Sequence, residues 1–154
     1  MVAKEVTLKL SIVELAKAKK PLKQRSNSVD SAEVIHVLPY LTAVERIAFV
    51  NELWRVMKKG ARAQIVTPYW ASNRTYSDLR VQWPPISEGW YFNLDSDYRK
   101  NDVNGDKRYK CDFNATWGYA LHPSLHTRNQ EYQQHAITFW KESAQDLIAT
   151  LIKK

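Results

Sequence analysis

The region from residue 28 to residue 70 constrains the fold of this chain more than any other part of it. A short apolar run at residues 32–38 comes first, a long amphipathic segment follows, and a second apolar run at residues 63–67 stops at Pro68. The first run is rich in β-branched residues, as in a strand that is buried on both faces of a parallel sheet. Strand, helix and strand at this spacing predict one βαβ unit with a right-handed crossover.

The segment between the two strands carries helix signals at both ends. Thr42 and Glu45 form a capping box at its start. Lys58 and Lys59 suit the negative end of the helix dipole, and Gly60 suits the left-handed position that follows a helix. Between these ends, apolar residues recur at helical spacing, namely Val44, Ile47, Phe49, Val50, Leu53, Trp54 and Met57.

The other segments predict a small set of further elements. We expect a strand at residues 4–10, a short helix that is capped by Ser11 and Glu14, a short helix at 87–92, a turn at 102–106 and a strand at 111–121. Thr127 and Gln130 open a last helix that runs through Leu147, and residues 148–152 either continue it or form a final strand. The chain is thus predicted to be a single α/β domain, with a partial Rossmann-like (doubly wound) sheet and flanking helices.

Composition limits the class of protein. The single cysteine, Cys111, excludes an internal disulfide and an all-cysteine metal site. No apolar run is long enough to span a bilayer, and the N-terminus lacks the apolar segment of a signal peptide, so we expect a cytoplasmic protein and no membrane association. The formal net charge is +7, and a basic region at residues 17–25 is either a solvated face or a weak nucleic-acid-binding surface.

Glycines are scarce where a nucleotide-binding sheet usually needs them. The chain has four glycines, and no two of them are close enough to form a G-x-G-x-x-G turn or a phosphate loop. The sequence therefore predicts the scaffold of a nucleotide-binding sheet without the usual glycine-rich loop.

Candidate site residues follow the two predicted strands of the βαβ unit. Because ligands of open α/β sheets gather beyond the carboxyl ends of the strands, the side chains at these ends are expected to share a pocket wall. His36 and Tyr40 are candidates for proton transfer, and Pro68, Tyr69 and Trp70 are candidates for cofactor contact. A hydrogen-bonded core histidine beside ordinary loop aromatics is the alternative interpretation of this pattern.

A second aromatic segment includes Trp83, Glu88 and Tyr91. These residues are candidates for substrate contact as part of a lid that stacks on a planar substrate, or they form a contact between subunits. The other histidines do not have the spacing of a metal site, so no metal is expected.

Several separated segments, taken in order, resemble one family. They are Ser28-Val29-Asp30, Val34-Ile35-His36-Val37-Leu38, Asn51-Glu52-Leu53-Trp54-Arg55-Val56 with Lys59-Gly60, and Thr67-Pro68-Tyr69. Together they resemble class I S-adenosylmethionine-dependent methyltransferases, and more narrowly the methyltransferase-like proteins of phages and environmental metagenomes. Segments 83–88, 117–123 and 129–151 are also similar to that group. The resemblance covers residues 26–154 as a methyltransferase-like C-terminal half, with residues 1–25 as a divergent N-terminal segment.

This resemblance implies a shortened methyltransferase-like protein that binds S-adenosylmethionine or a related adenosyl compound, with a pocket completed at a subunit interface. The sequence departs from the family at Pro39, where an acidic residue is usual, and the family's glycine loop has no counterpart before Ser26. The alternative is a non-catalytic phage interaction or assembly protein that has lost the cofactor. Both interpretations predict a homo-oligomer or a protein partner, in the host cytoplasm if the gene belongs to a phage.

Overall fold

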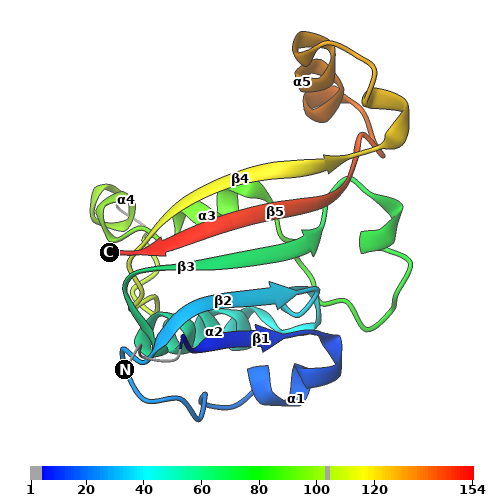
Figure 1. Ribbon diagram of the computed structural model, residues 1–154. Coiled ribbons are helices and arrows are strands. Elements are labelled where there is room, and N and C mark those ends of the chain that lie inside the picture. The colour runs from blue at the N-terminus through cyan, green and yellow to red at the C-terminus, as the bar shows by residue number, and fades with distance from the viewer. Residues whose placement is uncertain (1–4, 103–104) are drawn as a thin grey trace.

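The computed structural model describes residues 5–102 and 105–154, and these residues form one five-stranded mixed sheet with the strand order β1-β2-β3-β5-β4 (Figure 1). The strands are β1 (Thr7–Leu10), β2 (Val29–Ile35), β3 (Met57–Pro68), β4 (Phe113–Leu121) and β5 (Ala144–Lys153). β1, β2 and β3 are parallel, β5 is antiparallel to β3, and β4 is antiparallel to β5. The predicted α/β fold is confirmed, and so is the parallel pairing of the two strands in the βαβ unit.

The helices of the described residues are α1 (Leu15–Ala18), α2 (Ala43–Val56), α3 (Glu88–Phe92), α4 (Ser96–Asn101) and α5 (Gln130–Phe139), with short 3-10 turns at Ile12–Glu14, Leu38–Tyr40, Asn73–Thr75 and Pro123–Leu125. Figure 1 shows α2 and α3 behind the sheet and α5 standing away from it, beyond the ends of β4 and β5. The face of the sheet that is turned to the viewer carries no helix in the described part of the chain.

The uncovered face of the sheet is polar for most of its area. Thr7, Ser31 and Arg62 lie side by side in register near one end of it, and Lys9, Glu33 and Gln64 form the next row. The Lys9 ammonium lies 3.2 Å from the Glu33 carboxylate, and the Thr7 and Ser31 hydroxyls are 3.0 Å apart. The prediction that the first strand of the βαβ unit is buried on both faces is therefore wrong, because these side chains contact water and each other.

The opposite face packs against α2. The predicted capping box is present: Thr42 Oγ1 accepts a hydrogen bond from Glu45 N, and the Glu45 carboxylate accepts one from Thr42 N. The residues of α2 that are buried against the sheet and its neighbours are Arg46, Ile47, Phe49, Val50, Leu53 and Val56. The apolar side chains of this set form the core together with the buried sides of β2 and β3.

The helix ends earlier than the sequence predicts. α2 stops at Val56, and Lys58 to Gly60 belong to β3 instead of the helix terminus. Gly60 does have a left-handed backbone, with φ of +76°, but it lies in the stretch of β3 where the register with β2 shifts between Val29 and Ser31. A glycine suits this irregular stretch because it adopts positive φ without strain.

The predicted last helix is wrong at both ends. Its N-cap is Asn129, whose side chain accepts a hydrogen bond from Tyr132 N at 2.9 Å, and not Thr127. The helix ends at Phe139, and Ala144 and Leu147 lie in β5. The strand alternative for residues 148–152 is confirmed, and the strand begins at Ala144. Glu142, with φ of +63°, lies in the turn that reverses the chain.

A buried arginine fixes the loop that follows β2. Arg46 is almost fully buried, and its guanidinium donates hydrogen bonds to the carbonyl oxygens of Leu38, Gln82 and Pro84. Gln82 N donates in turn to Pro39 O at 2.8 Å. These contacts join the 82–84 segment to the chain just beyond the carboxyl end of β2.

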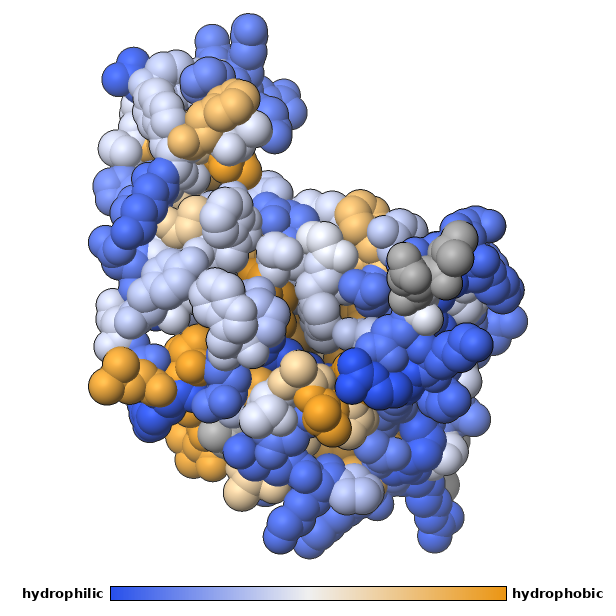
Figure 2. Space-filling view, turned by 180° about the vertical axis from the view of Figure 1, so that it is seen from behind, coloured by the Kyte–Doolittle hydropathy of each residue, from blue (hydrophilic) through white to orange (hydrophobic). Residues whose placement is uncertain are grey.

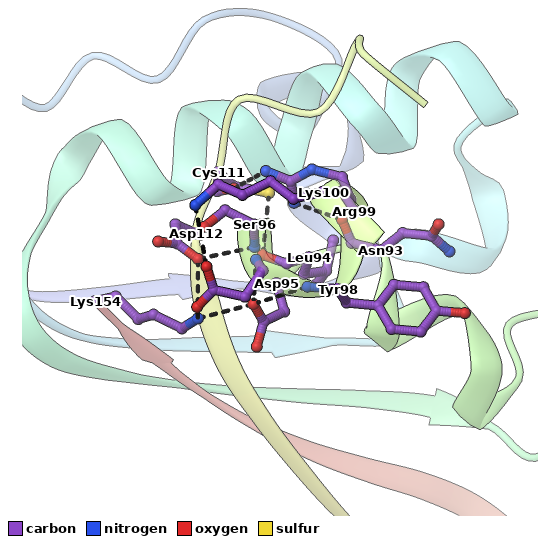
Figure 3. A network of polar contacts seen from close by, with 11 residues as sticks. Asn93, Leu94, Asp95, Ser96, Tyr98, Arg99, Lys100, Cys111, Asp112 and Lys154 are labelled. Carbon is purple, nitrogen blue, oxygen red and sulfur yellow. Dashed lines mark hydrogen bonds and ion pairs between the residues drawn. The ribbon is translucent and has the colours of Figure 1, made fainter. Parts of the chain in front are cut away.

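A polar network ties Lys154 to α4 (Figure 3). The Lys154 ammonium lies 2.8 Å from Asp95 Oδ1 and 3.3 Å from both Asp97 Oδ2 and Asp112 Oδ1. Arg99 donates hydrogen bonds to Cys111 O and Asn93 O, both at 2.7 Å. Part of the predicted 102–106 turn lies outside the described residues, but Gly105 N donates to Asp102 O at 2.9 Å.

Candidate functional site

His36 occupies the carboxyl end of β2 in an unusual conformation. Its φ is +53°, in the left-handed region that residues with a side chain seldom adopt. Its backbone N–H donates to Val66 O on β3 at 2.8 Å, which holds the residue against the neighbouring strand. Backbone strain of this kind is frequent at functional sites, where the surrounding structure maintains it.

The imidazole of His36 belongs to a three-residue cluster. Nε2 of His36 lies 3.1 Å from Oδ1 of Asp146 on β5, and the Arg74 guanidinium lies 3.3 Å from the same carboxylate. Burial raises the pKa of Asp146, but the hydrogen bond to His36 and the charge and hydrogen bonds of Arg74 outweigh burial, so the pKa falls below its ordinary value. The carboxylate is therefore ionised at neutral pH and orients the imidazole. We call these three residues the His36–Asp146–Arg74 cluster.

Tyr40 has different partners. Its hydroxyl donates to Asp78 at 3.1 Å, and the Arg80 guanidinium lies over its ring at 5.4 Å. Burial, and then the hydrogen bond to Asp78, raise the pKa of Tyr40 above its ordinary value, so the phenol stays protonated at neutral pH. Hydrogen bonds from Arg80 lower the pKa of Asp78. The two proposed proton-transfer residues thus belong to separate polar groups.

The three candidates for cofactor contact have different surroundings. Pro68 pairs in register with Asp146, which places it beside the His36–Asp146–Arg74 cluster. Tyr69 is buried, and its hydroxyl donates to Ile137 O at 3.0 Å. Burial, with the nearby Glu88 carboxylate, raises the pKa of Tyr69 to about 12. Trp70 is half exposed and packs against the Tyr69 ring. Of these three side chains, Trp70 is the most available to a ligand.

The structure does not bring the three candidates for substrate contact onto one surface. Trp83 is 78% exposed, whereas Tyr91 is fully buried and stacks on Trp117. Glu88 accepts a hydrogen bond from the Tyr119 hydroxyl at 2.8 Å. Burial raises the pKa of Tyr91 and of Tyr119, so both phenols remain protonated. The role of these three residues as substrate contacts stays a prediction.

Sequence reasoning missed Asp146 and Arg74. Asp146 lies in a segment that is predicted as helix, and Arg74 follows Trp70, where the sequence predicts no element and the structure has a short 3-10 turn. The nearest sequence signal is the strand alternative for residues 148–152, but that range does not include Asp146, which lies in the part of the strand that the sequence does not predict. Among the described residues, no group of three or more His, Cys, Asp or Glu side chains is arranged to hold a metal ion. The helices of the same residues include none with the length and apolar character needed to cross a membrane.

Comparison with known proteins gives structural neighbours only. No protein-family model matches the chain, and no curated protein sequence matches it. A crystal structure of a S-adenosylmethionine-dependent methyltransferase from Archaeoglobus fulgidus superposes with a TM-score of 0.58 at 14% identity, covering 91% of this chain and 64% of that one. A structure of the complex between the Haloferax volcanii Trm112 methyltransferase activator and the putative methyltransferase gives a TM-score of 0.55 at 8% identity, covering 99% of this chain and 84% of that one.

The chain spans less than two thirds of the length of the first of these neighbours. Identities of 8% and 14% establish similarity of fold and leave activity open. The described residues therefore have the Rossmann-like α/β fold of S-adenosylmethionine-dependent methyltransferases.

Proposed function

We propose that this protein binds S-adenosylmethionine or a related adenosyl compound at the carboxyl edge of β2 and β3, as a methyltransferase-like protein. The observation that carries the proposal is His36: a left-handed residue at the end of a parallel strand, with an imidazole held by an ionised carboxylate. In an open α/β sheet, this edge is where ligands bind.

The residues at this edge have the chemistry that an adenosyl ligand needs. The exposed ring of Trp70 offers a flat surface for a purine, and the carboxylate of Asp146 offers a hydrogen-bond acceptor. The turn after β1 offers fewer groups to a ligand, because Ser11 and Glu14 bind each other there. Both the amide and the hydroxyl of Ser11 donate hydrogen bonds to the Glu14 carboxylate. The proposed contacts therefore come from the ends of β2, β3 and β5 and not from a glycine loop.

The bound cofactor would supply a methyl group that is already activated on a positively charged sulfur. His36 would take the proton that a methyl acceptor loses, and Asp146 would hold the imidazole in place during that transfer. Arg74 keeps Asp146 ionised through its charge and hydrogen bonds. Tyr40 remains a proposed second contact, and Trp83, Glu88 and Tyr91 remain proposed contacts to the acceptor.

Isothermal titration with S-adenosylhomocysteine tests the proposal. We expect saturable heat with the unchanged protein and weaker binding for His36→Ala and for Trp70→Ala. Tyr98→Ala is a matched aromatic control, because Tyr98 is exposed on α4 and far from these strand ends in the fold. The absence of heat at high protein concentration, from protein with a folded circular dichroism spectrum, would refute cofactor binding.

A specific feature favours a second candidate function, a non-catalytic interaction protein. Among the described residues β1 pairs only with β2, so its other edge is open. A groove of about 520 Å³ runs beside it, with Leu8, Leu10 and Leu22 among its lining. Lys17, Lys20 and Lys23 also line the groove, which suits an acidic, partly apolar segment of a partner protein better than a second copy of this basic chain.

Lys17, Lys20 and Lys23 also belong to the basic region at residues 17–25, for which weak nucleic-acid binding is the alternative prediction. A further lysine of that region, Lys19, forms an ion pair with Glu45 at 3.3 Å. Sedimentation velocity at micromolar concentration tests self-association: a compact monomer would argue against the homo-oligomer. Titration with oligonucleotides at rising salt tests the nucleic-acid alternative, since binding through charge alone disappears as salt increases.

A further inference from the structure

We propose that a groove between residues 70–76 and the end of α5 binds a flat, mainly apolar ligand that carries a negative charge. The groove has a volume of about 390 Å³, within the size range of small-molecule sites. Its lining includes four aromatic residues and one lysine, namely Trp70, Tyr76, Phe139, Trp140 and Lys141. Figure 2 shows the α5 region projecting from the rest of the molecule, with hydrophobic residues visible on it.

The lining exposes more aromatic surface than folding requires. The exposed fractions are 41% for Trp70, 52% for Tyr76, 70% for Phe139 and 43% for Trp140. Single exposed aromatic residues are common on protein surfaces, but four in one concave groove mark a binding surface. Flat aromatic walls favour a flat ligand, because stacking and edge contacts both need a planar partner.

Contacts within the protein hold these walls in place. The Tyr76 hydroxyl donates to Trp70 O at 2.9 Å, which fixes Tyr76 next to Trp70. The Trp140 ring makes edge-on contacts with Tyr132 and His135, at centroid distances of 5.4 and 6.0 Å. Walls that are already ordered lose little conformational entropy when a ligand binds, so a modest contact area suffices for affinity.

Charge in the groove points to an anion. Lys141 is the only charged residue of the lining, and it makes no ion pair within the described part of the chain. Among the residues that the structure describes, no carboxylate lines the groove to attract a cation. A ligand with an apolar ring system and one carboxylate or phosphate would stack between the aromatic walls and place its charge near the Lys141 ammonium.

This inference goes beyond the proposed cofactor site, with which the groove shares only Trp70. S-adenosylmethionine carries a net positive charge, because its sulfonium and ammonium outweigh its carboxylate, and S-adenosylhomocysteine carries no net charge. Lys141 would therefore favour neither of them over a ligand that is an anion. Titrating S-adenosylhomocysteine and the groove probe separately, and then together, distinguishes the two sites: either ligand can bind while the other fails.

The test uses 2-naphthoate as the probe, with 2-naphthalenemethanol and 2-naphthylmethylammonium as neutral and cationic analogues. In isothermal titration of the full chain, we expect the affinity to be highest for naphthoate, lower for the alcohol and lowest for the ammonium. Trp140→Ala and Phe139→Ala should each weaken naphthoate binding by roughly tenfold. Lys141→Gln should weaken the binding of naphthoate by roughly threefold and leave the affinity for the alcohol unchanged.

Matched controls are Tyr98→Ala, an exposed aromatic residue on α4, and Lys59→Gln, an exposed lysine on β3. Neither should change the affinity for naphthoate. Phe139 is 70% exposed, so Phe139→Ala remains informative if Trp140→Ala fails to fold. A competition titration with a short oligothymidine distinguishes two sources of the flat anion. Displacement of naphthoate would indicate a nucleotide of a nucleic acid, and failure to displace it would indicate a free small molecule.

Three results would overturn the proposal. The first is no binding of naphthoate at millimolar concentration to protein that is folded by circular dichroism. The second is binding that Trp140→Ala and Phe139→Ala leave unchanged. The third is equal affinity for naphthoate and the naphthyl ammonium, which would remove the role of Lys141.

Discussion

The imidazole Nε2 of His36 lies 3.1 Å from Oδ1 of Asp146, although 110 residues separate them in the chain. The contact forms because β3 pairs with β2 on one side and with β5 on the other, so the end of β2 and the start of β5 meet at one edge of the sheet. Arg74, from the loop after β3, completes the group. Three segments that are distant in sequence thus converge where the fold class places its ligands.

Replacement of Asp146 should destabilise the protein. Asp146→Ala removes the partner of both His36 and Arg74 at a partly buried position, and we expect a loss of about 1–2 kcal/mol in the free energy of unfolding. Asp146→Asn keeps a hydrogen-bonding side chain, so its free energy of unfolding should fall by less. Urea denaturation measures both, with Gln145→Ala, at the exposed neighbouring position, as the control. Equal stability of Asp146→Ala and the unchanged protein would mean that the cluster contributes nothing to folding.

The left-handed backbone of His36 leads to a second prediction. Both His36→Ala and His36→Gly remove the imidazole, but only glycine adopts a φ of +53° without strain. We therefore expect His36→Gly to be more stable than His36→Ala by about 1 kcal/mol. Thermal or urea unfolding of the pair isolates the backbone effect, because neither variant keeps the contact to Asp146. If alanine proved as stable as glycine, the strain at this position would be refuted.

Arg46 offers a third test. Arg46→Met removes the guanidinium that donates to the carbonyl oxygens of Leu38, Gln82 and Pro84 at a buried position, and the free energy of unfolding should fall by about 3 kcal/mol. Arg46→Lys should also be destabilising, because one ammonium cannot match the geometry of the guanidinium. Urea denaturation gives the stability of each variant. Amide exchange of Gln82, which donates to Pro39 O, should accelerate locally when the segment is released.

The sequence predicts the βαβ unit well because its signals are local. The capping box of Thr42 and Glu45 lies within one turn of helix, and Pro68 terminates the apolar run of β3. The buried-strand pattern of residues 32–38, in contrast, does not reveal that one face of the sheet is uncovered, since that depends on where the helices pack. The partners of His36 are equally invisible, because β-sheet pairing joins residues that are far apart in sequence.

The boundary between α5 and β5 shows a different limit of prediction from sequence. Phe139, Trp140, Ala144 and Leu147 recur at a spacing that fits a helix, and no proline or glycine interrupts them. The structure breaks the helix at residues 140–143, where Glu142 takes a positive φ, and Ala144 then pairs with Leu121. Tertiary pairing with β3 and β4 thus overrides a local helical pattern. The helical pattern therefore does not reveal the partner of His36, because Asp146 reaches His36 only when this segment is a strand.

The network around Lys154 should make stability depend on pH in a defined way. Hydrogen bonds to Asp95, and then contacts with Asp112 and Asp97, raise the pKa of Lys154 above its ordinary value. Burial raises the pKa of Asp95, but Lys154 and backbone donors outweigh burial and lower it. Hydrogen bonds from Lys100 and Lys154 lower the pKa of Asp97. The lysine and the aspartates therefore stabilise each other in their charged forms.

The directions of these pKa shifts determine how the stability of the fold changes with pH. A raised lysine pKa stabilises the fold fully below the ordinary value of about 10.4, and that contribution is lost as pH rises through the higher folded value. Lowered aspartate pKa values stabilise the fold above about 3.9, and that contribution is lost as pH falls through the lower folded values. Lys154→Met should therefore be less stable than the unchanged protein between about pH 5 and pH 9, and the difference should shrink at lower pH.

Because these side chains are partly exposed and screened by water, the difference should not exceed about 1 kcal/mol at neutral pH. Urea denaturation at a series of pH values measures it, and Lys59→Met, at an exposed position on β3, is the control. Added salt should reduce the difference for Lys154→Met. A difference between the two proteins that stays constant from neutral pH to pH 2 would show that Lys154 acts through the packing of its aliphatic chain and not through its charge.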